Sequence, residues 1–81
     1  MEQLYNIGQI SKISGIPIAT LRYYDEIDLL KPKSVNQQTG YRYYSGDQLD
    51  RLDVIVYLKD LGFPLKKITS IMQNGRTVNS L

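Results

Sequence analysis

The segment NIGQISKISGIPIATLRYYDEIDLL, which runs from Asn6 to Leu30, predicts two helices joined by a short turn. Asn6 is a favourable helix N-cap, and Gln9 three residues later completes a capping box, so the first helix is expected to begin there. Gly15 ends this helix, and Pro17 fixes φ where the second helix begins. Two helices joined by a three-residue turn that contains glycine are typical of a helix-turn-helix.

The second helix, expected over residues 18–30, has two distinct faces at about 100° per residue. With Leu21 toward the interior, the same side carries Ile18, Tyr24 and Asp28. The side that points away from the interior carries Ala19, Arg22, Tyr23 and Glu26.

After this helix the chain changes character over residues 31–44. Pro32 is incompatible with a helix interior, and turn-forming residues precede an aromatic run. Two short strands are expected near residues 30–33 and 41–44, with a turn between them. Because a hairpin that directly follows a helix-turn-helix is a wing, the predicted fold class is mainly α, a winged helix-turn-helix with four helices and a small two-stranded β-hairpin.

The second half of the chain predicts the third and fourth helices. SGDQLDRLDVIVYLKDLG (45–62) begins with a capping box of Ser45 and Gln48 and ends at Gly62. Its apolar stripe is expected to contain Leu49, Leu52, Ile55, Val56 and Tyr57 or Leu58. FPLKKITSIM (63–72) is the fourth helix, and a break is expected at Asn74–Gly75. We therefore predict one domain over residues 1–73, followed by a tail over residues 74–81.

The composition limits the classes of function. The chain has 81 residues, of which 42% are hydrophobic and 22% charged, and a net charge of +2, as in a single globular domain that tolerates an anionic partner. It contains no cysteine and no histidine, which excludes the usual zinc sites and histidine-dependent catalysis. No signal peptide or membrane-length apolar stretch is present. We expect a cytoplasmic protein without cofactor, metal or membrane association.

The acidic residues give little support for catalysis. Asp47, Asp50 and Asp53 are spaced by three, as on a solvated helix surface. A carboxylate pair that performs acid–base chemistry needs a pocket that shifts one pKa, and a small helical domain offers little pocket. There is also no glycine-rich phosphate loop. We expect that the protein is not an enzyme.

The second helix is a better candidate for a binding surface. A helix in the DNA major groove needs small residues at its leading end and hydrogen-bond donors one turn later. Ala19 and Thr20 are small, and Arg22 offers a planar fork of donors for guanine or phosphate. Tyr23 offers a hydroxyl to a phosphate. The alternative is that Arg22 and Tyr23 are merely exposed side chains, but the glycine turn and the hairpin favour DNA.

The wing repeats the triplet RYY on a strand, where side chains alternate. One face carries Arg42 and Tyr44, and the other carries Tyr41 and Tyr43. Arg42 has no evident structural partner in the sequence, so we expect it to contact DNA. Tyr44, and also Tyr41, are expected to pack the wing onto the long helix. Lys31 and Lys33 would support phosphate binding electrostatically.

Lys66 and Lys67 open the fourth helix, where cations oppose the helix dipole. A nearby phosphate would offset this cost, because helix N-termini bind anions. Two lysines that only increase solubility are an equally good interpretation.

Three segments together carry a resemblance to a known family: IGQISKISGIPIATLRYYDEIDLLKP (7–32), GYRYYSGDQLDRL (40–52) and LKDLGFPLKKI (58–68). They closely resemble the N-terminal DNA-binding domain of MerR-family transcription regulators, and the match covers residues 5–72. The wording TLRYYDEIDLLKP is most similar to the multidrug-sensing branch.

This resemblance implies sequence-specific DNA binding, with a recognition helix over residues 18–28 in the major groove and a wing over residues 31–44 on the flanking backbone. A second, helical wing is implied near the fourth helix. The residues implied to contact double-stranded DNA are Ala19, Thr20, Arg22, Tyr23, Tyr24, Tyr41, Arg42 and Lys66. Because the helix periodicity places Tyr24 inward, we expect it to pack, with its hydroxyl near the DNA backbone.

The resemblance also implies partners for a full-length protein. Such a protein would be a homodimer, joined by an antiparallel coiled coil, that binds an inverted-repeat promoter operator. An effector bound elsewhere would make it distort the DNA and so act indirectly on RNA polymerase. The chain ends where the coiled coil would start, so we expect an isolated DNA-binding domain or a fragment that is monomeric. Pro17 also departs from the family, whose members commonly have a capping serine or threonine at this position.

Two alternatives remain open from the sequence. One is a monomeric, excisionase-like architectural protein that bends DNA without an effector, and a native chain that continues past Leu81 would argue against it. The other is a protein-interaction module that uses the exposed tyrosines of the second helix, whose binding would persist in high salt.

Overall fold

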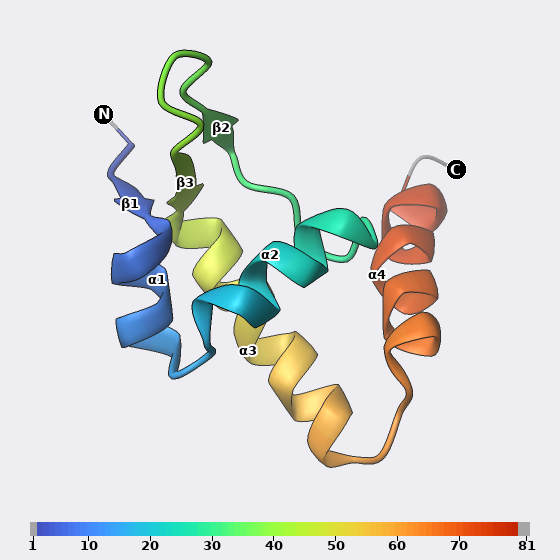
Figure 1. Cartoon of the computed structure of the whole chain (residues 1–81). Helices are drawn as coiled ribbons and strands as arrows, with labels where there is room; N and C mark the ends of the chain where they lie inside the picture. Colours follow the sequence, from blue (N-terminus) through green and yellow to red (C-terminus); the bar gives the residue numbers. More distant parts are fainter. Residues whose placement is uncertain (1, 80–81) are drawn as a thin grey trace.

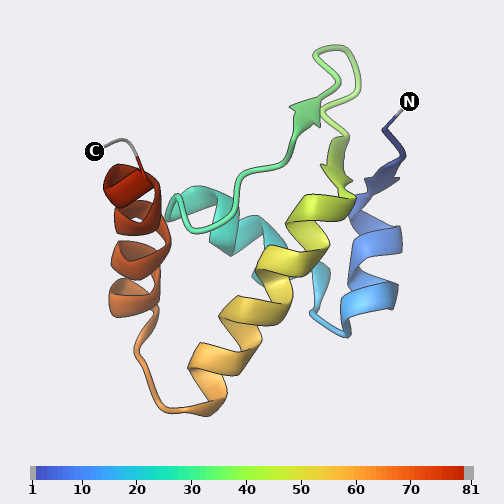
Figure 2. The same ribbon diagram turned by 180° about the vertical axis from the view of Figure 1, so that it is seen from behind.

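The computed structural model describes residues 2–79, and four helices and a small sheet lie within them (Figure 1). In chain order the elements are β1 (Leu4–Asn6), α1 (Ile7–Ser14), α2 (Ile18–Glu26), β2 (Ser34–Val35), β3 (Arg42–Ser45), α3 (Gly46–Asp60) and α4 (Leu65–Asn79). The views from the front and from behind agree that α1 and α4 lie at opposite ends, with α2 and α3 between them (Figure 2).

The first helix begins and ends as its sequence predicts. The backbone N–H of Gln9 donates to Asn6 Oδ1 at 2.8 Å, and the N–H of Asn6 donates to Gln9 Oε1 at 2.9 Å, which completes the capping box. Gly15 adopts φ 77°, a left-handed conformation in which glycine has no Cβ penalty, and its N–H donates to the Ser11 carbonyl. The turn of the helix-turn-helix therefore lies where it was predicted.

The second helix ends earlier than predicted, at Glu26 rather than Leu30. Asp28 has φ 61°, and the N–H groups of Leu29 and Leu30 both donate to the carbonyl of Tyr24. In this turn both leucines are buried. Two adjacent side chains on a continuing helix would point about 100° apart, so leaving the helix allows both to enter the core.

Two side chains that were expected on the inner face of α2 are exposed. Leu21 and Tyr24 are buried, as predicted, but Ile18 at the first turn is exposed. Asp28 is also exposed, because it lies beyond the end of the helix, where helical periodicity no longer applies.

The sheet contains three antiparallel strands in the order β1-β3-β2. Leu4 pairs with Ser45 across β1 and β3, and Val35 pairs with Arg42 across β2 and β3. The hairpin confirms the predicted wing, although β1 was not predicted. A strand of three residues directly before a helix cap has too short a pattern to be identified from sequence.

The first strand of the wing is Ser34–Val35, so its predicted position near residues 30–33 is wrong. Leu30 is buried in the core. The backbone of residues 31–33 is hydrogen-bonded to the Gln48 side chain rather than to a neighbouring strand. The N–H of Lys33 donates to Gln48 Oε1 at 3.0 Å, and Gln48 Nε2 donates to the Lys31 carbonyl. Gln48 also accepts from the N–H of Ser45, as the predicted capping box requires.

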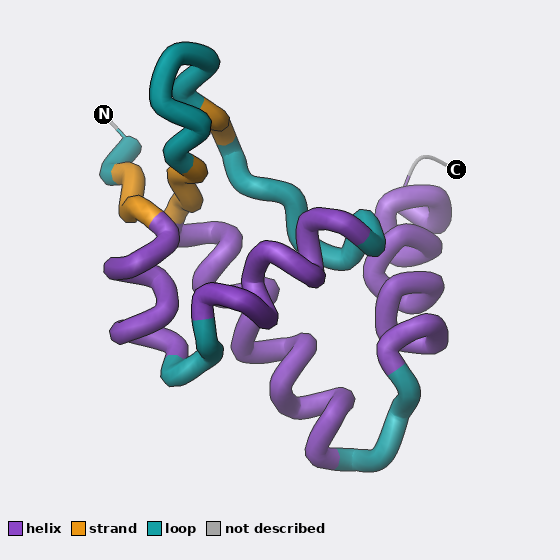
Figure 3. The backbone as a smooth tube through the Cα atoms, viewed as in Figure 1, coloured by secondary structure: helices purple, strands orange, loops and turns teal. Residues whose placement is uncertain are grey.

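The loop at the tip of the wing extends away from the helices (Figure 3). Asn36 Oδ1 accepts from the N–H groups of Gln38 and Thr39, and the Asn36 carbonyl accepts from Gly40, which has φ 76°. The predicted turn formers therefore hold this loop by local hydrogen bonds.

The core lies between α1, α2, α3, the sheet and the start of α4. Its largest fully buried side chains are Ile10, Leu21, Tyr24, Tyr44, Leu52, Ile55 and Ile68. Val56 of the predicted stripe on α3 is instead exposed. Of the two alternatives Tyr57 and Leu58, Leu58 packs against the core and Tyr57 is exposed. Leu52 and Ile55 face the core, whereas Val56, one position after Ile55, points about 100° away from it around the helix.

The fourth helix continues from Leu65 to Asn79, so the predicted break at Asn74–Gly75 is wrong. A single glycine within a helix costs only about 1 kcal/mol relative to alanine, which is too little to end it. The last two residues of the predicted tail, 80 and 81, lie outside the described residues. None of the helices described is long and apolar enough to cross a membrane.

Candidate nucleic-acid interface

The outer face of α2 presents the side chains that its periodicity predicted. Ala19, Arg22 and Tyr23 are exposed, and Thr20 is partly exposed. Tyr24 is 2% exposed and packs in the core, as the periodicity predicted. The outer face of α2 therefore carries small side chains in its first turn, and an arginine and a tyrosine about one turn later.

A hollow lies between the start of α1, the outer face of α2 and the wing. Its lining includes Ile7, Ile18, Arg22, Tyr41 and Arg42, and we call it the arginine hollow. The two RYY arginines thus lie at one site, although one is on a helix and the other on a strand.

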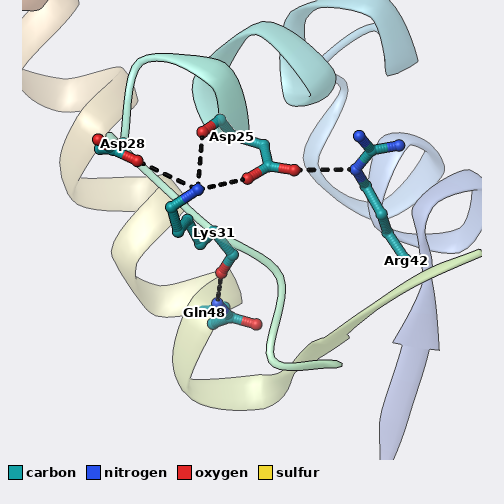
Figure 4. Close-up of polar contacts among 5 residues, drawn as sticks. All are labelled: Asp25, Asp28, Lys31, Arg42 and Gln48. Carbon is teal, nitrogen blue, oxygen red and sulfur yellow. Dashed lines mark hydrogen bonds and ion pairs between the residues drawn. The ribbon is translucent and has the colours of Figure 1, made fainter. Parts of the chain in front are cut away.

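Arg42 has a structural partner, which the sequence did not reveal. Its Nε donates to Asp25 Oδ2 at 3.0 Å, and the side chain is only 29% exposed (Figure 4). The expectation that Arg42 has no structural duty is therefore wrong. Residues 25 and 42 are far apart in the chain, and only the tertiary fold brings the last turn of α2 next to β3.

The predicted electrostatic support from Lys31 and Lys33 is reduced by neighbouring carboxylates. Lys31 Nζ lies 3.1 Å from Asp25 Oδ1 and 3.1 Å from Asp28 Oδ1. Lys33 Nζ lies 3.5 Å from Glu2 Oε1. Both lysines are therefore partly neutralised within the protein.

Asp25 is the centre of this network. Its burial raises the pKa of its carboxyl, but hydrogen bonds from Arg42 and Lys31 and the charges of both outweigh burial, so the pKa lies below its ordinary value. The hydrogen bonds to Asp28 and Asp25 raise the pKa of Lys31. The Asp25 carboxyl and the Lys31 ammonium are therefore both ionised at neutral pH.

The two tyrosines expected to pack the wing have different environments. Tyr44 is fully buried, as predicted, whereas Tyr41 is 63% exposed, so the packing prediction for Tyr41 is wrong. Tyr41 precedes β3, and the chain there already belongs to the loop at the wing tip. The pKa of the Tyr44 hydroxyl lies above its ordinary value because burial raises it more than the nearby charges of Arg42 and Arg22 lower it.

Lys59 on α3 was not identified from the sequence. Its Nζ donates to the Tyr24 hydroxyl at 3.4 Å and lies 6.0 Å from the ring centroid. It also lines a hollow that contains Pro17 and Thr20 at the start of α2. Pro17 provides no side-chain hydrogen bond to the helix, as predicted, so this cation lies beside an uncapped helix N-terminus. Thirty-five positions separate Lys59 from Tyr24, and no local pattern could have linked them.

Lys66, near the start of α4, lines a third hollow together with Tyr23, Ile27 and Thr69. This cation therefore lies on the α2 side of α4. Lys67 is exposed but does not line this hollow, so the two lysines differ in position.

Within residues 2–79 no group of three or more acidic, histidine or cysteine side chains could hold a metal ion.

Comparison with known proteins identifies the family. The family model described as MerR HTH family regulatory protein matches residues 5–75. The chain is 49% identical over 67 residues to the Multidrug-efflux transporter 1 regulator of Bacillus subtilis (strain 168), a match that covers 83% of this chain and 24% of that protein.

Two solved structures share the fold. The cryo-EM structure of the EcmrR-DNA complex in EcmrR-RPo is 41% identical, with a TM-score of 0.85 over 88% of this chain and 26% of that chain. The crystal structure of HiNmlR, a MerR family regulator lacking the sensor domain, bound to promoter DNA, is 28% identical, with a TM-score of 0.79 over 88% of this chain and 56% of that chain.

The fold and the exposed face of α2 define a winged helix-turn-helix protein. The chain belongs to the MerR HTH family of regulatory proteins, so the predicted family and fold class are confirmed. The chain spans about a quarter of the length of the curated relatives it matches.

Proposed function

We propose that this chain binds double-stranded DNA sequence-specifically, as part of a MerR-type transcription regulator. In this proposal α2 enters the major groove and the wing contacts the flanking backbone. The observation that carries it is that Arg22 of α2 and Arg42 of the wing line one hollow beside the exposed face of α2.

The chemistry of α2 supports this function. Ala19 and Thr20 leave room for close approach to base edges. The five N–H donors of an arginine suit either a guanine edge or a phosphate, so Arg22 can contribute to specificity or to register. Tyr23, half exposed, offers a hydroxyl on a rigid stem.

The wing and α4 supply further contacts at the edges of this surface. Arg42 and Tyr41 would reach the backbone on one side of α2, and Lys66 would reach it on the other. Tyr24 is buried and its hydroxyl accepts from Lys59 Nζ, so we assign it mainly to packing. Two solved relatives are described as bound to DNA, which supports DNA binding by this fold.

For the whole protein we infer a homodimer that binds an inverted-repeat promoter operator and acts on transcription without being an enzyme. The similarity to the Multidrug-efflux transporter 1 regulator supports the multidrug-sensing branch. A single copy of this chain would occupy one half-site, because an operator with two-fold symmetry matches a two-fold protein.

The proposal is tested by selecting duplexes from a random pool on the immobilised chain. The enriched duplex and a scrambled duplex of equal composition are then titrated by fluorescence anisotropy at several salt concentrations. Since a mismatched base pair costs about 1–3 kcal/mol, the enriched duplex should bind at least about tenfold more tightly. Affinity should fall as salt rises, by a slope of about 0.9 for each neutralised phosphate. Equal affinity for both duplexes would contradict sequence specificity, and salt-independent binding would contradict DNA binding.

A further inference from the structure

Asp25 lies in the last turn of α2 and joins three parts of the fold. Its Oδ2 accepts from Arg42 Nε on β3, and its Oδ1 accepts from Lys31 Nζ in the loop after the helix. The Asp25 carbonyl also accepts from the same Nζ, at 3.3 Å. The side chain is only 17% exposed, so the carboxylate is held on several sides.

The bond between Asp25 and Arg42 occupies only one edge of the guanidinium. It uses Nε, and the dashed line from Asp25 ends at Nε and at neither Nη atom (Figure 4). A guanidinium has five N–H donors in a fixed plane, so four remain on the two Nη atoms. Because Arg42 also lines the arginine hollow, fixing Nε fixes where these four donors lie relative to Arg22.

We propose that Asp25 is a positioning residue for DNA binding, which orients the Arg42 guanidinium so that its Nη donors meet the DNA backbone beside the site that Arg22 contacts. This inference rests on the proposed function. An arginine held in one orientation loses less side-chain entropy when it binds a phosphate than a freely rotating arginine does. The lowered pKa of the Asp25 carboxyl keeps the orienting group charged at neutral pH.

The sign of one mutational effect separates positioning from simple electrostatics. A carboxylate near DNA repels phosphates, so neutralising it should strengthen binding if charge alone matters. If Asp25 orients Arg42, Asp25→Asn should weaken binding about tenfold, because a charge-assisted contact to phosphate is lost. The salt slope of Asp25→Asn should then fall by about 0.9, which is nearly the decrease expected for Arg42→Ala.

The experiment titrates the enriched duplex with the unmodified chain, Asp25→Asn, Arg42→Ala and the double variant, at several salt concentrations. Asp28→Asn is the matched control. Asp28 is the other carboxylate partner of Lys31, its side chain is exposed, and the substitution removes the same charge. Asp25→Asn and Arg42→Ala should each weaken binding, and the double variant should be no weaker than Arg42→Ala alone. Asp28→Asn should bind as tightly as the unmodified chain or more tightly.

A second measurement uses the unmodified chain and does not depend on the folding of any variant. The Nε–Hε signal of Arg42 in a nitrogen-15 NMR spectrum should be protected from exchange, and it should stay protected when the duplex is added. Loss of this protection on binding would show that Arg42 leaves Asp25, and would overturn the proposal.

The outcomes distinguish the inference from the function on which it rests. If the unmodified chain binds no duplex, the proposed function is overturned and the inference with it. If the chain binds but Asp25→Asn binds equally or more tightly with an unchanged salt slope, only the positioning role is overturned. Thermal unfolding of each variant checks that the binding measurements are made on folded protein.

Discussion

Arg22 on α2 and Arg42 on β3 line the same hollow, although they are twenty positions apart in the chain. Each begins an RYY triplet, but the two triplets are not a structural repeat. On α2 the helical period turns Arg22 and Tyr23 outward together, whereas on β3 the period of two separates Arg42 from Tyr43. One basic site therefore combines an arginine from a helix with an arginine from a strand.

Arg22 is expected to contribute to base recognition. Arg22→Ala should weaken binding to the enriched duplex by about 1–3 kcal/mol, since a bidentate contact to a base is lost. Arg22→Lys keeps the charge but loses the planar fork, so it should keep the salt slope and lose discrimination against the scrambled duplex. Anisotropy titrations with both duplexes measure this, and unchanged discrimination in Arg22→Lys would restrict Arg22 to phosphate contact.

Two adjacent lysines on α4 provide a matched pair for the second edge of the surface. Lys66 lies beside Tyr23 in a common hollow, whereas Lys67 does not line it. Lys66→Ala should therefore reduce the salt slope by about 0.9, and Lys67→Ala should leave it nearly unchanged. Equal effects of the two substitutions would indicate that only the net charge of the domain matters.

The buried hydroxyl of Tyr44 should contribute little to stability. Among the described residues it has no hydrogen-bond partner, although the ring is fully buried. Because an unsatisfied buried polar group is costly, Tyr44→Phe should leave the free energy of unfolding unchanged or raise it by up to about 1 kcal/mol. Tyr44→Ala, which also removes the ring, should lower it by about 3–5 kcal/mol. Denaturant unfolding measures both, and a clear loss in Tyr44→Phe would reveal a partner for the hydroxyl.

The ion pairs of Asp25 should make stability depend on acidic pH. The folded-state pKa of Asp25 lies below its ordinary value of 3.8, so the native state favours the ionised carboxyl. This contribution is present above the unfolded-state pKa and is lost as the pH falls through the folded-state pKa. Between about pH 6 and pH 3, the unmodified chain should therefore lose more stability than Asp25→Asn does. Thermal unfolding across this range checks the prediction, and parallel curves for the two proteins would contradict it.

Local chemistry allowed several features to be predicted from sequence. The capping pair Asn6–Gln9, the left-handed Gly15 and the outward face of α2 depend on residues within one or two turns. The end of α2 did not follow from local pattern, because burial of both Leu29 and Leu30 decides it. Helix propensity and hydrophobic periodicity do not include the free energy gained by burying both leucines in the tertiary fold.

The interactions that position the candidate site could not be predicted, because they join distant residues. Asp25 and Arg42 are 17 positions apart and Lys59 and Tyr24 are 35 apart, so only the tertiary fold brings each pair together. Arg42 was correctly singled out as a candidate, but its structural role was not foreseen. Its contact with DNA, like that of the other site residues, stays a prediction.

The most direct test of a shared arginine surface is the salt slope of DNA binding for the double variant Arg22→Ala/Arg42→Ala. The slope of log affinity against log salt is measured for this variant and the unmodified chain on the enriched duplex. If both arginines face the DNA, the variant should lose between about 0.9 and 1.8 of slope, according to whether one or both contact phosphate, while remaining folded. An unchanged slope and affinity in the folded double variant would contradict the proposed DNA surface.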